Sequence, residues 1–345
     1  MTFPAISMVR RLYPDATIDL MARSWVMPVY SCHPDINSVM PAPSTSGISR
    51  PVAMAGAALL ARGERYDLGI LLPNSFESAL IFRLAGIRLV LGYSTDMRRF
   101  LVNMPVPVPA DKEQRHHVFY YINLVKKLEH KIGGRNNLQK EEPEPEIRMS
   151  IPPESKAWAG KFLENLASSH GKAETVIGFN PGAAFGPAKC WPAAKFNELA
   201  SLLLANFPGM HILVFGTAAE KAIGETIAEA APGHITNLCG RTGLSEAIAL
   251  IDRLDLLVTN DSGLMHVGAA CSTPLVAIFG STNHIATGPW TDKAAIVSLG
   301  LDCSPCMSRT CPSNFHCMLG INAEQVFEAS RKMLGQKPVH KTEAG

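Results

Sequence analysis

The chain has 345 residues, and its 32 lysine and arginine residues nearly balance 30 aspartate and glutamate residues, for a formal net charge of +2. Hydrophobic residues make up 47% and charged residues 18%, which is typical of a folded globular protein and excludes a disordered chain. The near-neutral charge, without a basic strip interleaved with aromatic residues, also argues against a nucleic-acid partner.

The first half alternates short apolar runs with amphipathic segments, which predicts parallel strands joined by crossover helices. Strands are predicted at 17–21, 67–72 and 89–92. Helices are predicted over the first dozen residues, at 74–85 and at 117–131. In the second of these helices, capped by Asn74 or Ser75, the expected apolar stripe holds Phe76, Leu80 and Leu84.

The segment 133–153 is rich in Gly, Pro, Asn and Glu and is the predicted linker. It divides the chain into domains 1–150 and 151–345. The second half restarts the α/β rhythm. Its strands are predicted at 175–179, 211–215, 256–259 and 275–279, and its helices at 192–206, 218–230, 244–254 and from 262 onward. The sequence therefore predicts an α/β protein with two Rossmann-like, doubly wound domains that face a cleft.

Ligands of such sheets bind beyond the carboxyl ends of the strands, and a loop rich in Gly and Pro follows the strand at 175–179. Gly182 and Gly186 let the backbone approach a ligand, and Lys189 adds a positive charge beside the start of a helix. This combination suits a diphosphate, although a plain strand-to-helix connection with a surface lysine fits the pattern as well. Glu220, after the next strand, is placed to bind ribose hydroxyls or simply to interact with the helix dipole.

A second candidate anion site follows the strand at 256–259. Ser262 and Gly263 present a hydroxyl and backbone N–H groups at a helix start, and His266 lies one turn further on the same face. Asp261 or Ser262 can cap this helix. The structural alternatives are a capping role alone for Asp261 and a partly buried imidazole for His266.

Four motifs carry a resemblance to a known family. They are P-G-A-x-F-G-P-A-K-x-W-P from Pro181, T-N-D-S-G-L-M-H-V from Thr259, L-P-N-S-F from Leu72 and G-Y-S-T-D-M-R-R from Gly92. The chain resembles the ADP-heptose:lipopolysaccharide heptosyltransferases over nearly its whole length, most closely the heptosyltransferase II group. The resemblance implies two Rossmann-like domains in the GT-B arrangement. It also implies an inverting glycosyltransferase that moves L-glycero-D-manno-heptose from ADP-heptose to the lipopolysaccharide inner core and needs no metal or other cofactor for catalysis.

The resemblance also implies roles for individual residues. Lys189 would face the diphosphate and help ADP depart, and Glu220 would hold the ribose. The remaining donor-site residues would be Gly182 in the first loop, Ser262, Gly263 and Leu264 at the phosphate, and Asp261 and His266 beside the donor sugar. On the N-terminal domain, Asn74, Arg98 and Arg99 would meet the heptosyl-Kdo-lipid A acceptor.

One departure from the family concerns the general base. The family begins with a strand that ends in a Trp-x-Gly-Asp loop, whose Asp is the expected base. Nothing here corresponds, because the chain opens with a helical stripe of Phe3, Ile6, Val9 and Leu12. We therefore expect the first strand of the N-terminal domain to be missing and the natural protein to extend upstream. Asp96 is the candidate for a substitute base.

Two alternatives to heptose transfer stay open. One is a GT-B transferase for another nucleotide sugar, and the other is a chain that binds the donor but, without its base, does not transfer the sugar. No apolar run approaches the ~18 residues of a membrane span, and no secretory signal is visible. We expect a cytoplasmic protein whose lipid acceptor implies peripheral contact with the inner membrane.

Four of the eight cysteines lie close together in the sequence: Cys303, Cys306, Cys311 and Cys317. With His316 they would suit tetrahedral zinc or an iron–sulfur cluster. The alternative is a loop of partly buried thiols with a labile disulfide. The sequence thus allows a structural zinc site that takes no part in catalysis.

Overall fold

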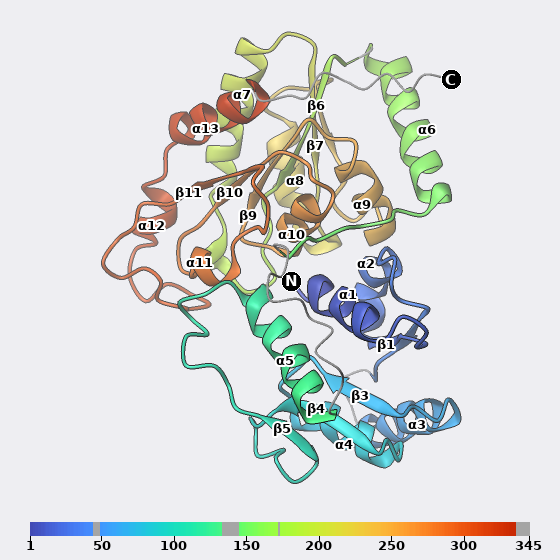
Figure 1. The fold of residues 1–345 in the computed structure, drawn as a ribbon. Coiled ribbons are helices and arrows are strands. Elements are labelled where there is room, and N and C mark those ends of the chain that lie inside the picture. The colour runs from blue at the N-terminus through green and yellow to red at the C-terminus, as the bar shows by residue number, and fades with distance from the viewer. Residues whose placement is uncertain (44–48, 133–144, 172, 336–345) are drawn as a thin grey trace. The chain divides into compact units, whose positions relative to one another are not determined.

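The computed structural model describes residues 1–43, 49–132, 145–171 and 173–335, and the chain divides into two compact units, Met1–Arg148 and Met149–Gly345 (Figure 1). Residues 133–144 of the predicted linker lie outside the described part. Each of the strand pairs in the described residues is parallel. The predicted α/β fold with parallel sheets is therefore confirmed.

The second unit contains a six-stranded sheet in the order β11-β10-β9-β6-β7-β8. Its strands are β6 (Thr175–Asn180), β7 (Met210–Val214), β8 (Ile235–Asn237), β9 (Leu256–Asn260), β10 (Leu275–Ile278) and β11 (Ala294–Val297). From β6 the chain first builds the sheet outward through β7 and β8, and then returns to β9 on the other side of β6. The strand order therefore reverses between β6 and β9, and this switch point is where doubly wound sheets bind ligands.

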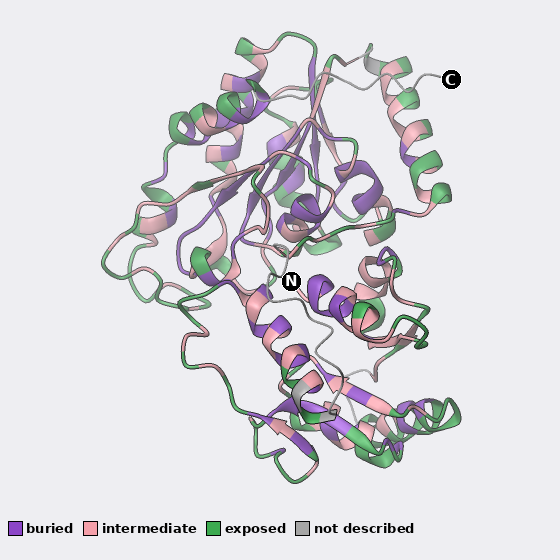
Figure 2. Cartoon of the chain, viewed as in Figure 1, coloured by how far each residue is buried: buried purple, intermediate pink, exposed green. Residues whose placement is uncertain are grey.

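Helices cover both faces of this sheet. The helices of the unit are α6 (Pro153–His170), α7 (Ala193–Asn206), α8 (Lys221–Ala228), α9 (Leu244–Ile251), α10 (Gly263–Ala270), α11 (His284–Thr287), α12 (His316–Leu319) and α13 (Ala323–Gly335), with 3-10 turns η2 (Pro187–Lys189) and η3 (Ala218–Glu220). Helix α7 packs against α8 and α13, whereas α10 packs against α9, which in turn contacts α6. Strands β7, β9 and β10 are buried at every position, as strands covered on both faces should be (Figure 2).

The first unit has smaller sheets. In its described residues β1 (Asp19–Ala22) pairs with β2 (Ser38–Pro41), and β3 (Leu68–Leu71), β4 (Leu89–Tyr93) and β5 (Met104–Val106) form a three-stranded sheet. Its helices are α1 (Phe3–Leu12), α2 (Met27–Ser31), α3 (Arg50–Gly63), α4 (Phe76–Leu84) and α5 (His117–Ile132), with a 3-10 turn η1 (Ser24–Val26). Helix α1 packs against α5, and α3 against α4.

The predicted apolar stripe of α4 is wrong, although the helix itself is confirmed. Phe76 and Leu84 are 40% and 52% exposed, whereas Ala79 and Ile81 are buried. The reason is that α4 lies close against α3, where small alanine side chains from both helices make the core. Ser75 caps the helix as predicted, since its side chain accepts a hydrogen bond from the Ser78 N–H.

Among the helices that the structure describes, none is both long and apolar enough to cross a membrane.

Candidate active site

Buried hydrogen bonds join the loops that follow β6 and β9. The Asn180 side-chain amide, at the end of β6, donates to Thr259 Oγ1 (3.0 Å) and Ser262 Oγ (2.5 Å). In the reverse direction, the Asn260 amide donates to the Pro181 carbonyl (2.6 Å). The two segments that the sequence singled out therefore form one rigid surface at the switch point of the sheet.

A lysine and a carboxylate meet on this surface. Lys189 Nζ lies 2.5 Å from Asp261 Oδ2, and both side chains are largely buried, at 13% and 6% exposure. Thr282, just after β10, donates its hydroxyl to the same carboxylate oxygen (2.6 Å). The Lys189 ammonium also lies 4.7 Å from the centre of the Phe185 ring, a cation–π contact. Asp261 and Phe185 thus hold the ammonium in place, and Thr282 fixes the carboxylate with which it pairs.

The start of α10 presents uncapped N–H groups beside this pair. Ser262 occupies the N-cap position but makes no side-chain cap hydrogen bond, because its hydroxyl is engaged with Asn180. Gly263 is exposed, and Leu264 and His266 are half-buried on the same short helix. A helix start of this kind attracts anions through its N–H groups and its dipole.

The structure also brings Gly182 and Glu220 together. A Cβ atom at Gly182 would lie 1.5 Å from Glu220 Oε1, so the carboxylate occupies the space that any other residue would need for its side chain. Glu220 Oε2 accepts hydrogen bonds from the Thr217 N–H (2.6 Å) and hydroxyl (2.9 Å), in a capping box that opens η3. Glu220 is therefore fixed against the glycine-rich loop.

In the first unit, Arg98 and Asn74 belong to one network. Arg98 is fully buried, and its guanidinium donates to the Tyr93 carbonyl (3.0 Å), the Pro73 carbonyl (2.5 Å) and Asn74 Oδ1 (3.2 Å). Asn74 in turn donates to the Tyr120 hydroxyl (2.8 Å). Burial lowers the pKa of the Arg98 guanidinium from its ordinary value.

Two residues close to Arg98 in the sequence are exposed to solvent, unlike Arg98 itself. Arg99 is exposed, and Asp96 is exposed in a left-handed backbone conformation (φ 50°). The structure therefore places Asn74 and Arg98 together and presents Arg99 separately to solvent.

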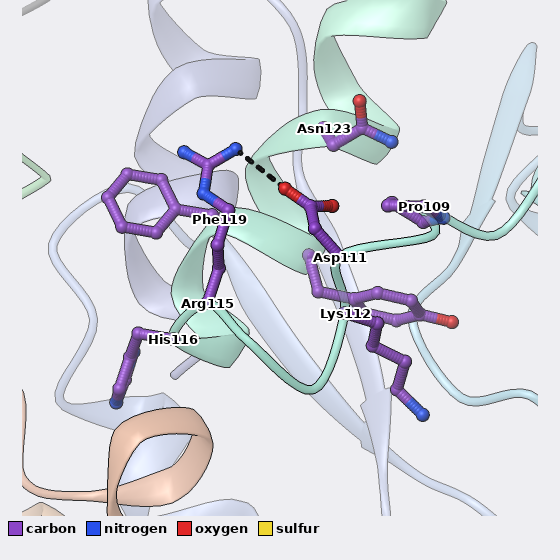
Figure 3. A pocket seen from close by; sticks show the side chains of 8 residues that line it. Pro109, Asp111, Lys112, Arg115, His116, Phe119 and Asn123 are labelled. Atoms are coloured by element: carbon purple, nitrogen blue, oxygen red, sulfur yellow. Dashed lines mark hydrogen bonds and ion pairs between the residues drawn. The ribbon is translucent and has the colours of Figure 1, made fainter.

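Tyr120 also lines a small, open cavity of about 70 Å³ at the start of α5 (Figure 3). Lys112 Nζ lies 5.5 Å from the centre of the Tyr120 ring, and Arg115 pairs with Asp111 at 3.4 Å. The lining residues are Pro109, Asp111, Lys112, Arg115, His116, Phe119, Tyr120 and Asn123. Polar and aromatic side chains thus share this cavity, which the Asn74–Tyr120 hydrogen bond links to the network of Arg98.

The structural zinc site that the sequence allows is not found in the described residues, where no group of three or more His, Cys, Asp or Glu side chains is arranged to hold a metal ion. Cys303 and Cys306 are exposed free thiols, and Cys311 and Cys317 are half-buried free thiols. Local hydrogen bonds engage Cys311, whose sulfur accepts from the Phe315 N–H (3.3 Å). Hydrogen bonds to this sulfur, from Ser313 first, lower the pKa of the Cys311 thiol.

The residues of these networks that sequence reasoning missed include Phe185, Thr282, Asn180 and Tyr120. Thr282 follows the strand predicted at 275–279. The rule that ligands bind beyond the carboxyl ends of the strands, which located Lys189 and Asp261, could therefore have found Thr282 as well. Phe185 lies inside the glycine-rich loop, but nothing in the sequence shows that its ring faces Lys189.

The fold and the site together define a doubly wound α/β protein in which Lys189, Asp261 and the start of α10 meet at the switch point of the sheet, the usual place for a ligand. The model of glycosyltransferase family 9 (heptosyltransferase) matches residues 59–316. The chain belongs to this family and is a glycosyltransferase.

Individual relatives agree. The chain is 33% identical to lipooligosaccharide heptosyltransferase 2 of Haemophilus influenzae, over 83% of this chain and 81% of the relative. It is 34% identical to lipopolysaccharide heptosyltransferase 2 of Escherichia coli, over 83% and 80%. Among solved structures it resembles E. coli ADP-heptose lps heptosyltransferase II with a TM-score of 0.79 and 31% identity, over 97% and 94% of the two chains.

Proposed function

We propose that this enzyme transfers L-glycero-D-manno-heptose from ADP-heptose to a heptosyl-Kdo-lipid A acceptor of the lipopolysaccharide inner core, with inversion at the anomeric carbon. The observation that carries the proposal is the grouping of Lys189, Asp261 and Thr282 beside the open start of α10. The names of its relatives supply the sugar and the acceptor class.

In this proposal the donor diphosphate binds between Lys189 and the N–H groups of Ser262, Gly263 and Leu264. Negative charge grows on the ADP oxygen as the glycosidic bond breaks, and fixed positive groups aimed at that oxygen stabilise the transition state. Asp261 holds the Lys189 ammonium in place through their ion pair until the donor arrives. Because the lysine and the helix supply the positive charge, the proposed mechanism requires no metal ion.

The remaining donor-site roles follow from position. Glu220 holds the ribose hydroxyls, since its carboxylate is fixed against Gly182 at the carboxyl end of the sheet. His266, one turn along α10 from Ser262, borders the donor sugar together with Asp261.

The first unit is proposed to bind the acceptor. Asn74 and the exposed Arg99 contact it, whereas buried Arg98 orients Asn74 and supports the loop that carries Arg99. An excess of basic residues in this unit, 18 Lys and Arg against 14 Asp and Glu in residues 1–148, favours an acceptor with acidic sugars. Because that acceptor is a lipid, we propose that the enzyme works in the cytoplasm as a peripheral protein on the inner membrane.

A transfer assay tests the proposal. The chain is incubated with heptosyl-Kdo-lipid A and ADP-heptose, and, in parallel, with other nucleotide sugars, and the product is identified by mass spectrometry. We expect one added heptose and stoichiometric release of ADP with ADP-heptose alone. Transfer of a different sugar would replace the proposed donor, and ADP-heptose binding without transfer would contradict the proposed reaction.

A further inference from the structure

The segment of residues 303–311, hereafter the cysteine strap, touches two loops of the donor site. The Met307 N–H donates to the Ser281 carbonyl (2.8 Å), directly before Thr282, and the Ala188 N–H donates to the Arg309 carbonyl (3.2 Å), directly before Lys189. The strap thus contacts the neighbours of two residues that hold Asp261.

Arg309 makes a second contact with the glycine-rich loop. Its Nε donates to the Phe185 carbonyl (2.9 Å), and its guanidinium lies 5.7 Å from the centre of the Phe185 ring. The same ring lies 4.7 Å from the Lys189 ammonium. One aromatic side chain therefore contacts both the strap arginine and the proposed catalytic lysine.

Gly186 shows how closely the loop and the strap approach each other. Its φ is +148°, and a Cβ atom there would lie 2.4 Å from the Arg309 carbonyl oxygen. Backbone oxygen cannot move aside as a flexible side chain can, so no side chain fits at this position. Arg309 thus binds the loop on both sides of Gly186, at Phe185 and at Ala188.

We infer that Arg309 is a positioning residue for sugar transfer, which holds the loop 185–188 so that Phe185 keeps its place beside Lys189 and Lys189 keeps its place beside Asp261. Arg309 is itself exposed and acts through Phe185. The inference rests on the proposed role of Lys189. A shift of about 1 Å in a catalytic group can cost on the order of 100-fold in rate, so loosening this loop lowers kcat.

The experiment compares Arg309→Ala and Arg309→Lys with Arg331→Ala, a control that removes an exposed arginine paired with Glu328 on α13. Hydrogen exchange of the peptide containing residues 186–190 reports loop order without depending on activity. Steady-state kinetics report the consequence. We expect Arg309→Ala to speed exchange there and lower kcat at least about 10-fold, with an unchanged KM for the acceptor. Arg309→Lys, which can still donate to Phe185, recovers part of both effects.

A double variant distinguishes a positioning role of Arg309 from a general effect of its loss on the stability of the protein. Because Arg309 acts through Lys189, adding Arg309→Ala to Lys189→Ala should lower turnover no further. Unchanged exchange in Arg309→Ala, unchanged kcat, or a full additional loss in the double variant would each overturn the inference. If the unaltered chain transfers no heptose, the proposed function fails, and the exchange measurement alone then decides whether Arg309 positions the loop.

Discussion

Among single side chains, Lys189 carries the largest expected effect. Replacing it with Ala removes the ammonium that the structure holds 2.5 Å from Asp261. Loss of one fixed donor to a developing charge typically costs on the order of 100- to 1,000-fold in kcat, and we expect a loss of this size in the heptose transfer assay. Lys195→Ala is the matched control, because Lys195 pairs with Glu198 on the surface of α7 and should retain turnover. Near-normal turnover of Lys189→Ala would contradict the proposed role.

Replacing Arg98 should lower the stability of the protein, whereas replacing its neighbour Arg99 should weaken acceptor binding. Arg98→Ala leaves the carbonyls of Pro73 and Tyr93 without their charged donor in a buried site, which we expect to cost about 2 kcal/mol or more of unfolding free energy. Arg99→Ala changes an exposed side chain, so stability should stay within about 0.5 kcal/mol while the acceptor KM rises. Urea unfolding of both variants, beside acceptor kinetics, measures the contrast. If both variants lost the same unfolding free energy, the burial of Arg98 and the exposure of Arg99 would not explain their different roles.

For helices and strands, the sequence predicts best where burial is complete. Strands β7, β9 and β10 read as continuous apolar runs because helices cover both faces of the sheet. The short edge strand β8 (Ile235–Asn237) carries only one buried residue and was not predicted. Helix α13 was missed as well, and its apolar face includes the buried Ser330, whose hydroxyl bonds to the Val326 carbonyl.

Two glycines test whether local packing decides stability within these elements. Gly178 lies in the central strand β6, and a Cβ atom there would meet Leu254 at 2.5 Å, so Gly178→Ala should destabilise the protein by about 1–3 kcal/mol. Gly160 lies inside α6 with nothing within 4 Å of an added Cβ, so Gly160→Ala should stabilise by about 0.5–1 kcal/mol. Thermal unfolding checks both. A stabilising Gly178→Ala would show that the strand can shift to accept the methyl group.

In the molecule as a whole, the site depends on strand order more than on any motif. Lys189 and Asp261 lie 72 positions apart, and they meet because β6 pairs with β9. The motifs located both loops after strands, and the general rule for doubly wound sheets pointed to their common edge. The rule could not show that Ser262 would bond to Asn180 instead of capping α10, nor that Arg309, 124 positions beyond Phe185, would bind the same loop. Such contacts depend on how loops pack in three dimensions.

The two units should also unfold separately, since each has its own core. One buried cysteine reports on each: Cys32 in the first unit and Cys239 in the second, at 3% and 1% exposure. Burial raises the pKa of both thiols to about 11. At pH 8 the folded units therefore contain little of the thiolate that reacts with alkylating reagents, and labelling requires unfolding.

We expect Cys32 to become alkylated at a lower urea concentration than Cys239. The first unit rests on described sheets of two and three strands, whereas the second contains a six-stranded sheet whose strands β7, β9 and β10 are buried at every position. This larger sheet removes more apolar surface from water. Mass spectrometry of labelled peptides across a urea series at pH 8 measures both transitions. Cys303 and Cys306, which are exposed, should react without urea and serve as internal controls. Coincident transitions would mean that the two units unfold as one, with a coupling between them stronger than the difference between their cores.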